Sequence, residues 1–323
     1  MGEQYPVNER ASLLADVAEM YYLEEKGQAE IARAVGVTRS MVSRMLKEAR
    51  EKGIVEVRVH RTLRSEYDLE LALAERFSLL GTYIVSSQRT APENNLTYLG
   101  SAGALVLKRQ LKAGAILGIS WGTSVSAAVD ALQVEKTIPV KIVQLVGALG
   151  ARNAEYDGHA LVTRLAEKLG GEGYHLNAPF LCPNPETAAA LLETQGIRES
   201  VELGRMAEVA LMGIGSTAPL YSSAYLAGYL PFDDLDQLIQ AGAVGDVCGV
   251  NFDIHGQLIC ADFCKRLVTI QNDDLLAIPV RIGIAGGQGK VPPILGALRG
   301  GYINFLVTDG DTARQVLELA AKN

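Results

Sequence analysis

The sequence predicts an α/β protein in which a winged helix-turn-helix precedes a large Rossmann-like domain. Hydrophobic residues make up 48% of the 323 residues and aromatic residues only 6%, so aliphatic side chains must supply the core, as in sheets that are buried on both faces. From about residue 80 onward, short apolar runs alternate with helical stretches. Near the N-terminus, two short helical patterns flank a glycine turn in a strongly basic segment.

The first helical pattern covers residues 9–24, where apolar side chains recur at spacings of three and four and therefore share one face. A short second helix is expected over Gln28–Val35. Gly36 follows it directly, and glycine tolerates the left-handed conformation that a tight turn requires. Two helices joined by such a turn are typical of a helix-turn-helix motif.

Thr38 is a good N-cap for the third helix, which we expect to end at Gly53. Residues 54–59 (IVEVRV) then alternate between apolar and polar, as a half-exposed strand does. The order of helix, short helix, turn, helix and strand predicts a winged helix-turn-helix domain over residues 1–60.

Polar residues 61–66 are the expected linker, and residues 67–323 form the second domain, beginning with a helix at Tyr67–Phe77. The predicted strands are 82–86, 115–120, 141–146, 174–179, 209–215, 281–286 and 303–308. Predicted helices between them include 158–169, 185–195 and 311–321. This alternation predicts a mainly parallel sheet covered by helices on both faces. The strand-rich stretch 244–270 interrupts it and is expected to be an antiparallel extension.

Positive charge is concentrated in one window. The chain has a net charge of −7, yet residues 33–64 hold nine Lys or Arg against three Glu. This window therefore carries +6 and the rest of the chain −13. A basic block on an acidic protein indicates one surface that faces a polyanion.

The third helix has the residues to read a DNA groove. Its apolar stripe faces inward and its other side presents side chains that can contact bases or phosphates: Arg39, Ser40, Ser43, Arg44 and Lys47, together with Thr38 at its start. Gln28 begins the preceding helix, where it can touch a phosphate. The alternative is a solvated charged helix in a small helical subdomain. One such module makes few contacts, so we expect a dimer or tetramer on paired half-sites of operator DNA.

Two glycine-rich turns that lead from strands into helices indicate an anion site in the second domain. One holds Ser120, Gly122, Thr123 and Ser124, and the other holds Gly286, Gly287 and Lys290. Ligands of open α/β sheets bind beyond the carboxyl ends of strands, where glycine permits close approach and helix N-termini attract anions. Ordinary tight turns are the alternative. Neither turn matches a P-loop or a dinucleotide fingerprint, so no nucleotide cofactor is expected.

Asp246 is a lone acid in an apolar, glycine-rich stretch, where it can accept hydrogen bonds from sugar hydroxyls or cap a turn. The four cysteines include no C-x-x-C pair, and the four histidines are scattered, so no metal site is expected. No apolar run reaches the length of a membrane span and no signal peptide is recognisable. We therefore expect a cytoplasmic protein without membrane partners.

Several segments together resemble the SorC family of sugar-binding transcriptional regulators. They include QAEIARAVGVTRSMVSRMLKEAREKGIVEVRV, GISWGTS, VQLVGALG, GAVGDVCGVNFDIHGQ and IPVRIGIAGGQGK. The resemblance implies a C-terminal domain related to sugar-phosphate isomerases and a homo-oligomer whose DNA affinity responds to a phosphorylated sugar.

The resemblance also implies roles for particular residues. The two glycine-rich turns would hold phosphate, Asp246 would bind hydroxyls of the effector, and Gly147 and Ala148 would line the sugar site. Val146 stands where some relatives carry a lysine that captures ligand as a Schiff base, so covalent capture is not expected.

The expected function is a ligand-responsive regulator, a repressor of a carbohydrate operon, with no catalytic residues. A sugar-phosphate isomerase with an added helical domain is the alternative. Such an enzyme needs a general acid and a general base that converge on the sugar. Asp246 could supply one, but neither glycine-rich turn contains a His or Glu as its partner.

Overall fold

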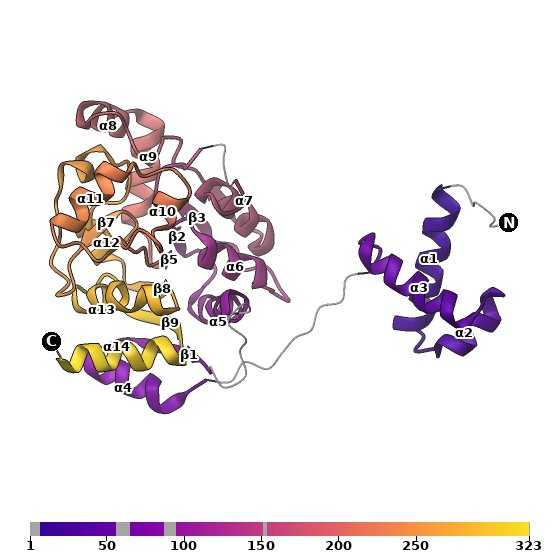
Figure 1. Cartoon of the computed structure of the whole chain (residues 1–323). Helices are drawn as coiled ribbons and strands as arrows, with labels where there is room; N and C mark the ends of the chain where they lie inside the picture. Colours follow the sequence, from indigo (N-terminus) through magenta and orange to yellow (C-terminus); the bar gives the residue numbers. More distant parts are fainter. Residues whose placement is uncertain (1–6, 56–64, 87–94, 151–153, 323) are drawn as a thin grey trace. The chain divides into compact units, whose positions relative to one another are not determined.

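The computed structural model describes residues 7–55, 65–86, 95–150 and 154–322 (Figure 1). The chain divides into two compact units, Met1–Thr62 and Leu63–Asn323, and each has its own buried core.

The smaller unit consists of α1 (Val7–Tyr22), α2 (Gln28–Val35) and α3 (Arg39–Glu51). Helix α2 ends because Gly36 adopts the left-handed conformation, with φ 72°. The three helices enclose a small apolar core made of Leu14, Val17, Ala18, Ile31, Ala32, Val42, Met45, Leu46 and Ala49. The helix order predicted from the sequence is therefore confirmed, with α1 displaced by two residues from the predicted range.

The predicted wing and linker fall largely outside the described residues. Of the strand expected at 54–59, only Ile54 and Val55 are described, and they are not in a strand. Of the expected linker, Ser65 and Glu66 are described. Ser65 forms a β-bridge with Val85, and the Glu66 N–H donates to the Ile84 carbonyl at 3.1 Å. These two residues are therefore attached to the larger unit.

The larger unit is built around a seven-stranded sheet with the order β1-β9-β8-β5-β2-β3-β4, and every neighbouring pair is parallel. The strands are β1 (Gly81–Val85), β2 (Ile116–Ile119), β3 (Lys141–Gln144), β4 (Glu172–Tyr174), β5 (Val209–Gly213), β8 (Val280–Ile284) and β9 (Phe305–Asp309). The chain runs outward from β2 to β4, returns to β5, and then runs outward on the other side through β8 to β9. Strands β2 and β5 therefore flank a topological switch point.

Helices cover both faces of this sheet (Figure 1). They are α4 (Tyr67–Phe77), α5 (Asn95–Gln110), α6 (Thr123–Ala131), α7 (Gly158–Leu169), α8 (Pro185–Leu192), α9 (Gln195–Arg205), α10 (Ser223–Leu226), α11 (Phe232–Gln240), α12 (Asn272–Ala277), α13 (Val291–Arg299) and α14 (Gly310–Lys322). Short 3-10 turns are η3 (Ala154–Tyr156), η4 (Asp262–Arg266) and η5 (Gln288–Lys290). No helix within the described ranges has the length and hydropathy needed to cross a membrane.

Two predicted elements were wrong in detail. The strand expected at 174–179 lies instead at Glu172–Tyr174; of residues 175–179, Pro179 alone forms an isolated bridge, with Ala148. Leu176 and Ala178 alternate because they pack in a separate apolar cluster with residues of α8 and α9, not because they pair in the sheet. The helix expected at 185–195 ends at Leu192, and α9 follows.

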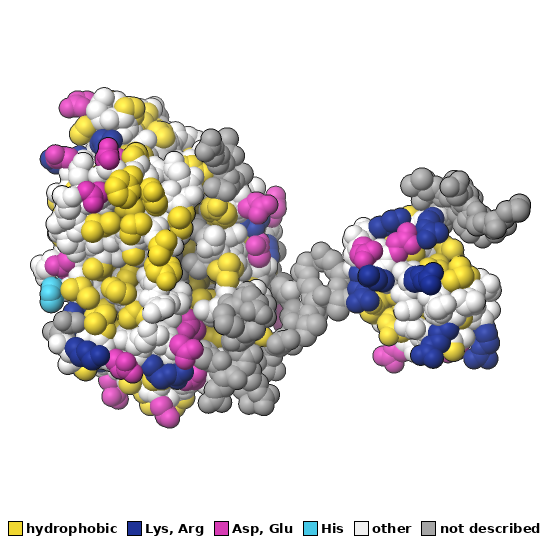
Figure 2. All heavy atoms as spheres, viewed as in Figure 1, with side chains coloured by type: hydrophobic (Ala, Val, Ile, Leu, Met, Phe, Trp, Pro, Cys, Tyr) yellow, Lys and Arg dark blue, Asp and Glu magenta, His cyan; other side chains and the backbone are white. Residues whose placement is uncertain are grey.

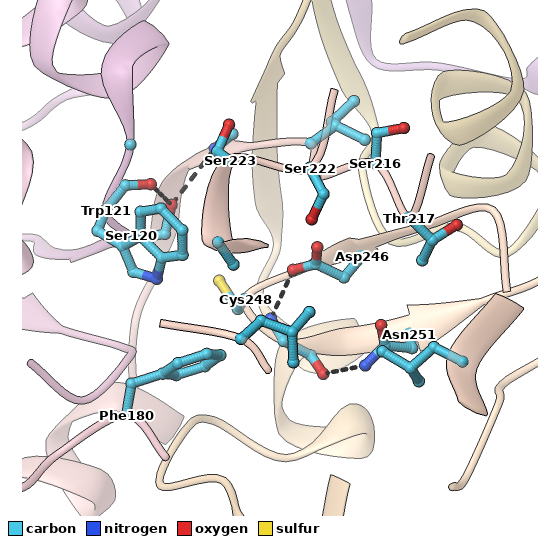
Figure 3. A pocket seen from close by; sticks show the side chains of 18 of the residues that line it. Ser120, Trp121, Phe180, Ser216, Thr217, Ser222, Ser223, Asp246, Cys248 and Asn251 are labelled. Carbon is cyan, nitrogen blue, oxygen red and sulfur yellow. Dashed lines mark hydrogen bonds between the residues drawn. The ribbon is translucent and has the colours of Figure 1, made fainter. Parts of the chain in front are cut away.

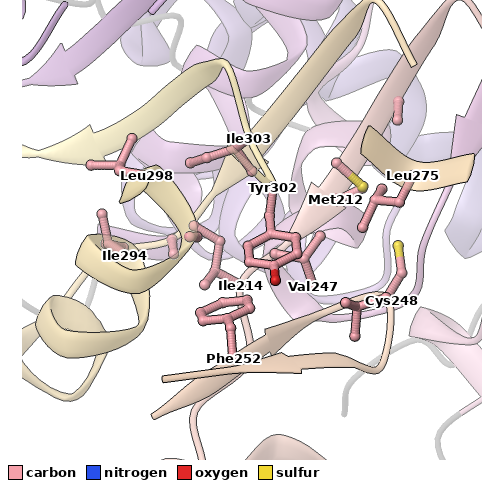
Figure 4. Packing of buried hydrophobic residues seen from close by; sticks show 14 of the residues in the cluster. Met212, Ile214, Val247, Cys248, Phe252, Leu275, Ile294, Leu298, Tyr302 and Ile303 are labelled. Atoms are coloured by element: carbon pink, nitrogen blue, oxygen red, sulfur yellow. The ribbon is translucent and has the colours of Figure 1, made fainter. Parts of the chain in front are cut away.

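The stretch 244–270 contains an antiparallel hairpin, as expected, but it does not extend the main sheet. Strands β6 (Gly245–Val247) and β7 (Val250–Phe252) form a separate two-stranded sheet. Figure 4 shows how Val247 and Phe252 enter the core of the larger unit, where the Phe252 ring stacks on Tyr302 at 4.6 Å. The hairpin also lies against α13 and next to the end of β5, where the Gly215 N–H donates to the Asp246 carbonyl at 2.8 Å.

Candidate functional site

Helix α3 presents a polar face to solvent and buries its apolar stripe. Val42, Met45, Leu46 and Ala49 are buried, in agreement with the inward stripe expected from the sequence. The side chains expected to read DNA are all exposed: Arg39, Ser40, Ser43, Arg44 and Lys47. Gln28 is half-buried at the start of α2. The structure therefore places the candidate DNA-binding residues on one small unit.

Hydrogen bonds fix the start of α3. The Thr38 hydroxyl accepts a hydrogen bond from the Met41 N–H at 3.3 Å, which confirms Thr38 as the N-cap. The hydroxyls of Thr38 and Ser40 lie 3.0 Å apart and share a hydrogen bond. Thr38 and Ser40 therefore stabilise the N-terminus of the helix on which Arg39, Ser43, Arg44 and Lys47 lie.

Arg39 and Arg44 are not paired with the acidic residues that the structure describes in this unit. Glu48 binds Arg10 through two hydrogen bonds and Lys52 at 2.8 Å, and these partners lower the pKa of Glu48 to about 2. Within the described part of the chain, Arg39 and Arg44 have no acidic partner within 4 Å. Figure 2 shows Lys and Arg side chains spread over the visible face of the smaller unit. Unpaired guanidinium groups are suited to phosphate and guanine contacts.

A cavity of about 120 Å³ opens in the larger unit where β2, β5 and β8 end (Figure 3). Six predicted site residues line it: Ser120, Gly122, Thr123, Ser124, Asp246 and Lys290. They come from the β2–α6 turn, the β6–β7 hairpin and the turn after β8. Because β2 and β5 flank the topological switch point, the cavity lies where open α/β sheets bind their ligands.

One end of the cavity is suited to an anion. The Lys290 ammonium donates to the Ile214 carbonyl at 2.8 Å, and the Ser124 hydroxyl donates to the Ile284 carbonyl at 3.1 Å. Both groups therefore lie at the ends of adjacent strands. Gly122 has φ 130°, a conformation that favours glycine, and it leads directly into the N-terminus of α6. A cation, hydroxyls and a helix N-terminus thus surround the same space.

Asp246 lies beside this cationic end. A Cβ atom at Gly215 would lie 1.9 Å from Asp246 Oδ1, so only glycine fits between β5 and the carboxylate. The Asp246 Oδ2 atom accepts the Gly249 N–H at 2.9 Å. Burial raises the pKa of Asp246, while the Gly249 hydrogen bond and the charge of Lys290 oppose that shift. Burial likewise lowers the pKa of Lys290, against the attraction of Asp246.

Four predicted residues do not line the cavity. Gly147 and Ala148 face the chain at Pro179: a Cβ at Gly147 would lie 2.7 Å from the Pro179 carbonyl carbon. Gly286 and Gly287 pack against Asp309 instead. The Gly287 N–H donates to Asp309 Oδ2 at 3.1 Å and to Thr312 Oγ1 at 2.8 Å. Because both acceptors belong to the protein, this N–H is not free to bind an anion.

The cavity lining also includes residues that the sequence patterns did not predict. Ser216, Thr217, Ser222 and Ser223 come from the segment after β5, and Asn251 comes from β7. Trp121 and Phe180 form an aromatic wall, with ring centroids 6.2 Å apart. A polar run, STAPLYSS, directly after an apolar strand was the signal available in the sequence. Among the described residues, no group of three His, Cys, Asp or Glu side chains could hold a metal ion.

Comparisons with known proteins agree with this division into two units. A family described as a sugar-binding domain matches residues 62–318, and the crp family of bacterial regulatory proteins matches residues 27–55. The chain is 32% identical to the sorbitol operon regulator of Klebsiella pneumoniae, over 95% of this chain and 98% of that protein. It is 29% identical to the deoxyribonucleoside regulator of Bacillus subtilis, over 96% and 98%.

The solved structures include a relative that matches over nearly the whole of both chains. The full-length sorbitol operon regulator SorC from Klebsiella pneumoniae has a TM-score of 0.72 to this structure and 31% sequence identity, and the match covers 96% of this chain and 99% of that one. Both the fold and the sequence are therefore shared over both units. The chain belongs to the SorC family of sugar-binding transcriptional regulators.

Proposed function

We propose that this regulator is a repressor of a carbohydrate operon and that a phosphorylated sugar in the cavity changes its affinity for the operator. One observation supports this effector class above all: a basic residue, Lys290, and an acidic residue, Asp246, line a single cavity. The ammonium, together with the α6 N-terminus, suits a phosphate, and the carboxylate suits hydroxyl groups.

On the DNA side, we propose that α3 enters the major groove. The bases and phosphates would be contacted by Arg39, Ser40, Ser43, Arg44 and Lys47. Thr38, at the start of α3, and Gln28, at the start of α2, would bind the DNA backbone. The exposure of Arg39 and Arg44 and their lack of acidic partners in the described segments support this assignment.

We also propose a homo-oligomer, a dimer or a tetramer. A single helix-turn-helix contacts one half-site, and two-fold symmetry doubles the contacts on a palindromic operator. Effector binding can alter operator affinity only if it favours one arrangement of the subunits over another.

Thermal-shift screening of the full chain against sugar phosphates tests the effector. We expect a phosphorylated sugar to raise the melting temperature, because a ligand that binds only the folded state stabilises it. A phosphate-free analogue should raise it less. If no sugar phosphate shifts the melting temperature, the proposed effector class is wrong.

Operator binding is tested with duplexes selected from a random DNA pool. Arg44→Ala should weaken binding and relax the choice of base at one position, at a cost of about 1–3 kcal/mol. Arg50→Ala is the matched control, because Arg50 lies on the same helix and its guanidinium donates to the Leu46 carbonyl at 3.4 Å. Equal effects of the two variants would remove Arg44 from the reading surface.

An isomerase-like enzyme is the second candidate, and one observation favours it. The pKa of Asp246 is raised and that of Lys290 is lowered, as in pairs that exchange protons with a substrate. We infer that the site binds without turnover, because no His or Glu of the described segments lines the cavity as a further acid or base. Isomerisation of a sugar phosphate by the full chain, lost in Asp246→Asn, would contradict this.

A further inference from the structure

The corner of the β6–β7 hairpin projects an unusual residue into the effector cavity. Val247 pairs with Val250, so Cys248 and Gly249 alone form the turn. Both have positive φ, 55° and 77°, as a type I′ turn requires. Asn and Gly are the residues that such turns favour, and a side chain such as cysteine is strained there. Turn chemistry alone therefore does not explain Cys248.

The Cys248 thiol lines the cavity. Figure 3 shows the Cys248 sulfur on the wall between Trp121 and Asp246. A hydrogen bond holds the backbone of this turn in place, because the Thr269 hydroxyl donates to the Cys248 carbonyl at 2.6 Å. Burial raises the pKa of the Cys248 thiol, and the nearby Asp246 carboxylate raises it further. The thiol is therefore neutral, and it offers an apolar surface with only weak hydrogen bonding.

A second, independent feature lies across from this wall. Ser222 is only 3% exposed, lines the cavity, and points its hydroxyl toward Asp246 (Figure 3). No partner for this hydroxyl exists among the residues that the structure describes. The Ser222 side chain is thus enclosed by protein while its hydroxyl faces the cavity, so this position is suited to a polar atom supplied by a ligand.

Three other polar groups of the lining already have protein partners. The Ser120 hydroxyl donates to the Trp121 carbonyl, the Thr217 hydroxyl donates to the Ala243 carbonyl, and the Asn251 amide donates to the Gly249 carbonyl. These three groups are therefore less available to a ligand hydroxyl placed beside Cys248. A ligand hydroxyl that lost its water there without a new hydrogen bond would weaken binding.

We propose that Cys248 and Ser222 determine which phosphorylated sugar binds. The Cys248 thiol packs against a carbon of the effector that carries no hydroxyl group, and Ser222 and Asp246 bind the neighbouring hydroxyl. This rests on the proposed function, since it assumes that a sugar phosphate occupies the cavity. It narrows the effector class to deoxygenated sugar phosphates.

The test compares sugar phosphates that differ by one hydroxyl. The full chain is titrated with ribose 5-phosphate, glucose 6-phosphate and their 2-deoxy analogues, and the fluorescence of Trp121, the single tryptophan, reports binding. In at least one pair, the wild type should bind the deoxy compound about tenfold more tightly, which corresponds to about 1.4 kcal/mol. Cys248→Ser should bring this ratio close to one, because a serine hydroxyl can pair with the extra ligand hydroxyl. Ser222→Ala should weaken both members of the pair about tenfold.

Cys182→Ser is the matched control. Cys182 is also buried, and burial also raises its pKa, but it packs with Ala188 and Val268 away from the cavity. This variant should lower the melting temperature and leave the ligand ratio unchanged. Equal binding of parent and deoxy compounds by the wild type, or a ratio that Cys248→Ser does not change, overturns the selectivity assignment while the effector proposal stands. If none of the four compounds binds, the selectivity assignment falls, and the thermal-shift screen against other sugar phosphates decides whether the effector class stands.

Discussion

Replacing Lys290 with methionine removes one positive charge from the effector cavity and keeps a side chain of similar length. In the structure the Lys290 ammonium donates to the Ile214 carbonyl at 2.8 Å and lies at the cavity end that suits a phosphate. A hydrogen bond to a charged group contributes about 1.5–3 kcal/mol. Lys290→Met should therefore raise the Kd of a sugar phosphate by about 10- to 150-fold. The Kd of the corresponding unphosphorylated sugar should change little.

Fluorescence titration measures both constants, because Trp121 lines the same cavity. Lys168→Met is the matched control: the Lys168 ammonium also donates to main-chain carbonyls, those of Asp130 and Leu132 at 2.9 and 3.0 Å, but it does not line the cavity. This control should leave both Kd values at their wild-type level. Unchanged affinity of Lys290→Met for the phosphorylated sugar, or an equal loss of affinity for both ligands, would refute a phosphate-binding role for Lys290.

Three further results are expected. Burial lowers the pKa of Lys290 from 10.5, so affinity for a sugar phosphate should be highest below that lowered pKa and fall as pH rises through it, which calorimetry at pH 7–10 measures. Gly215→Ala should weaken binding at least tenfold, because its Cβ would lie 1.9 Å from Asp246 Oδ1 and displace the carboxylate; fluorescence titration checks this. Glu48 has its pKa lowered from 4.5 to about 2, so its contribution to stability is present above pH 4.5 and is lost as pH falls toward 2. Glu48→Gln should therefore melt at a lower temperature than the wild type at pH 7, and circular dichroism should show the two melting temperatures converging below pH 3.

Local sequence patterns predicted many elements because their causes are local. Helix α2 was predicted at its observed bounds, since Gly36 ends it by adopting a backbone conformation that favours glycine. Helices α4 and α7 also begin and end where expected. Apolar runs predicted six strands of the main sheet, because strands buried on both faces are almost wholly apolar.

Patterns failed where burial had another cause. Leu176 and Ala178 alternate like a strand, yet they fill a cluster beneath α8 and α9. Gly286 and Gly287 belong to a loop that has the composition of an anion cradle. In the structure Asp309 accepts the Gly287 N–H, and a Cβ at Gly286 would lie 2.3 Å from the Asp309 carboxylate. Asp309 lies more than twenty residues away in the sequence, and no local pattern reveals that contact.

The sequence by itself determined that a basic helix with a Thr38 cap precedes a parallel α/β sheet, because capping, periodicity and charge act over a few residues. Only the tertiary structure decided which polar residues share the cavity. Ser222 and Cys248 enter it from two segments, and Asp246 meets Lys290 there, because β5 lies between β2 and β8 in the sheet. Strand order depends on packing between distant segments, and it alone brings those strand ends together.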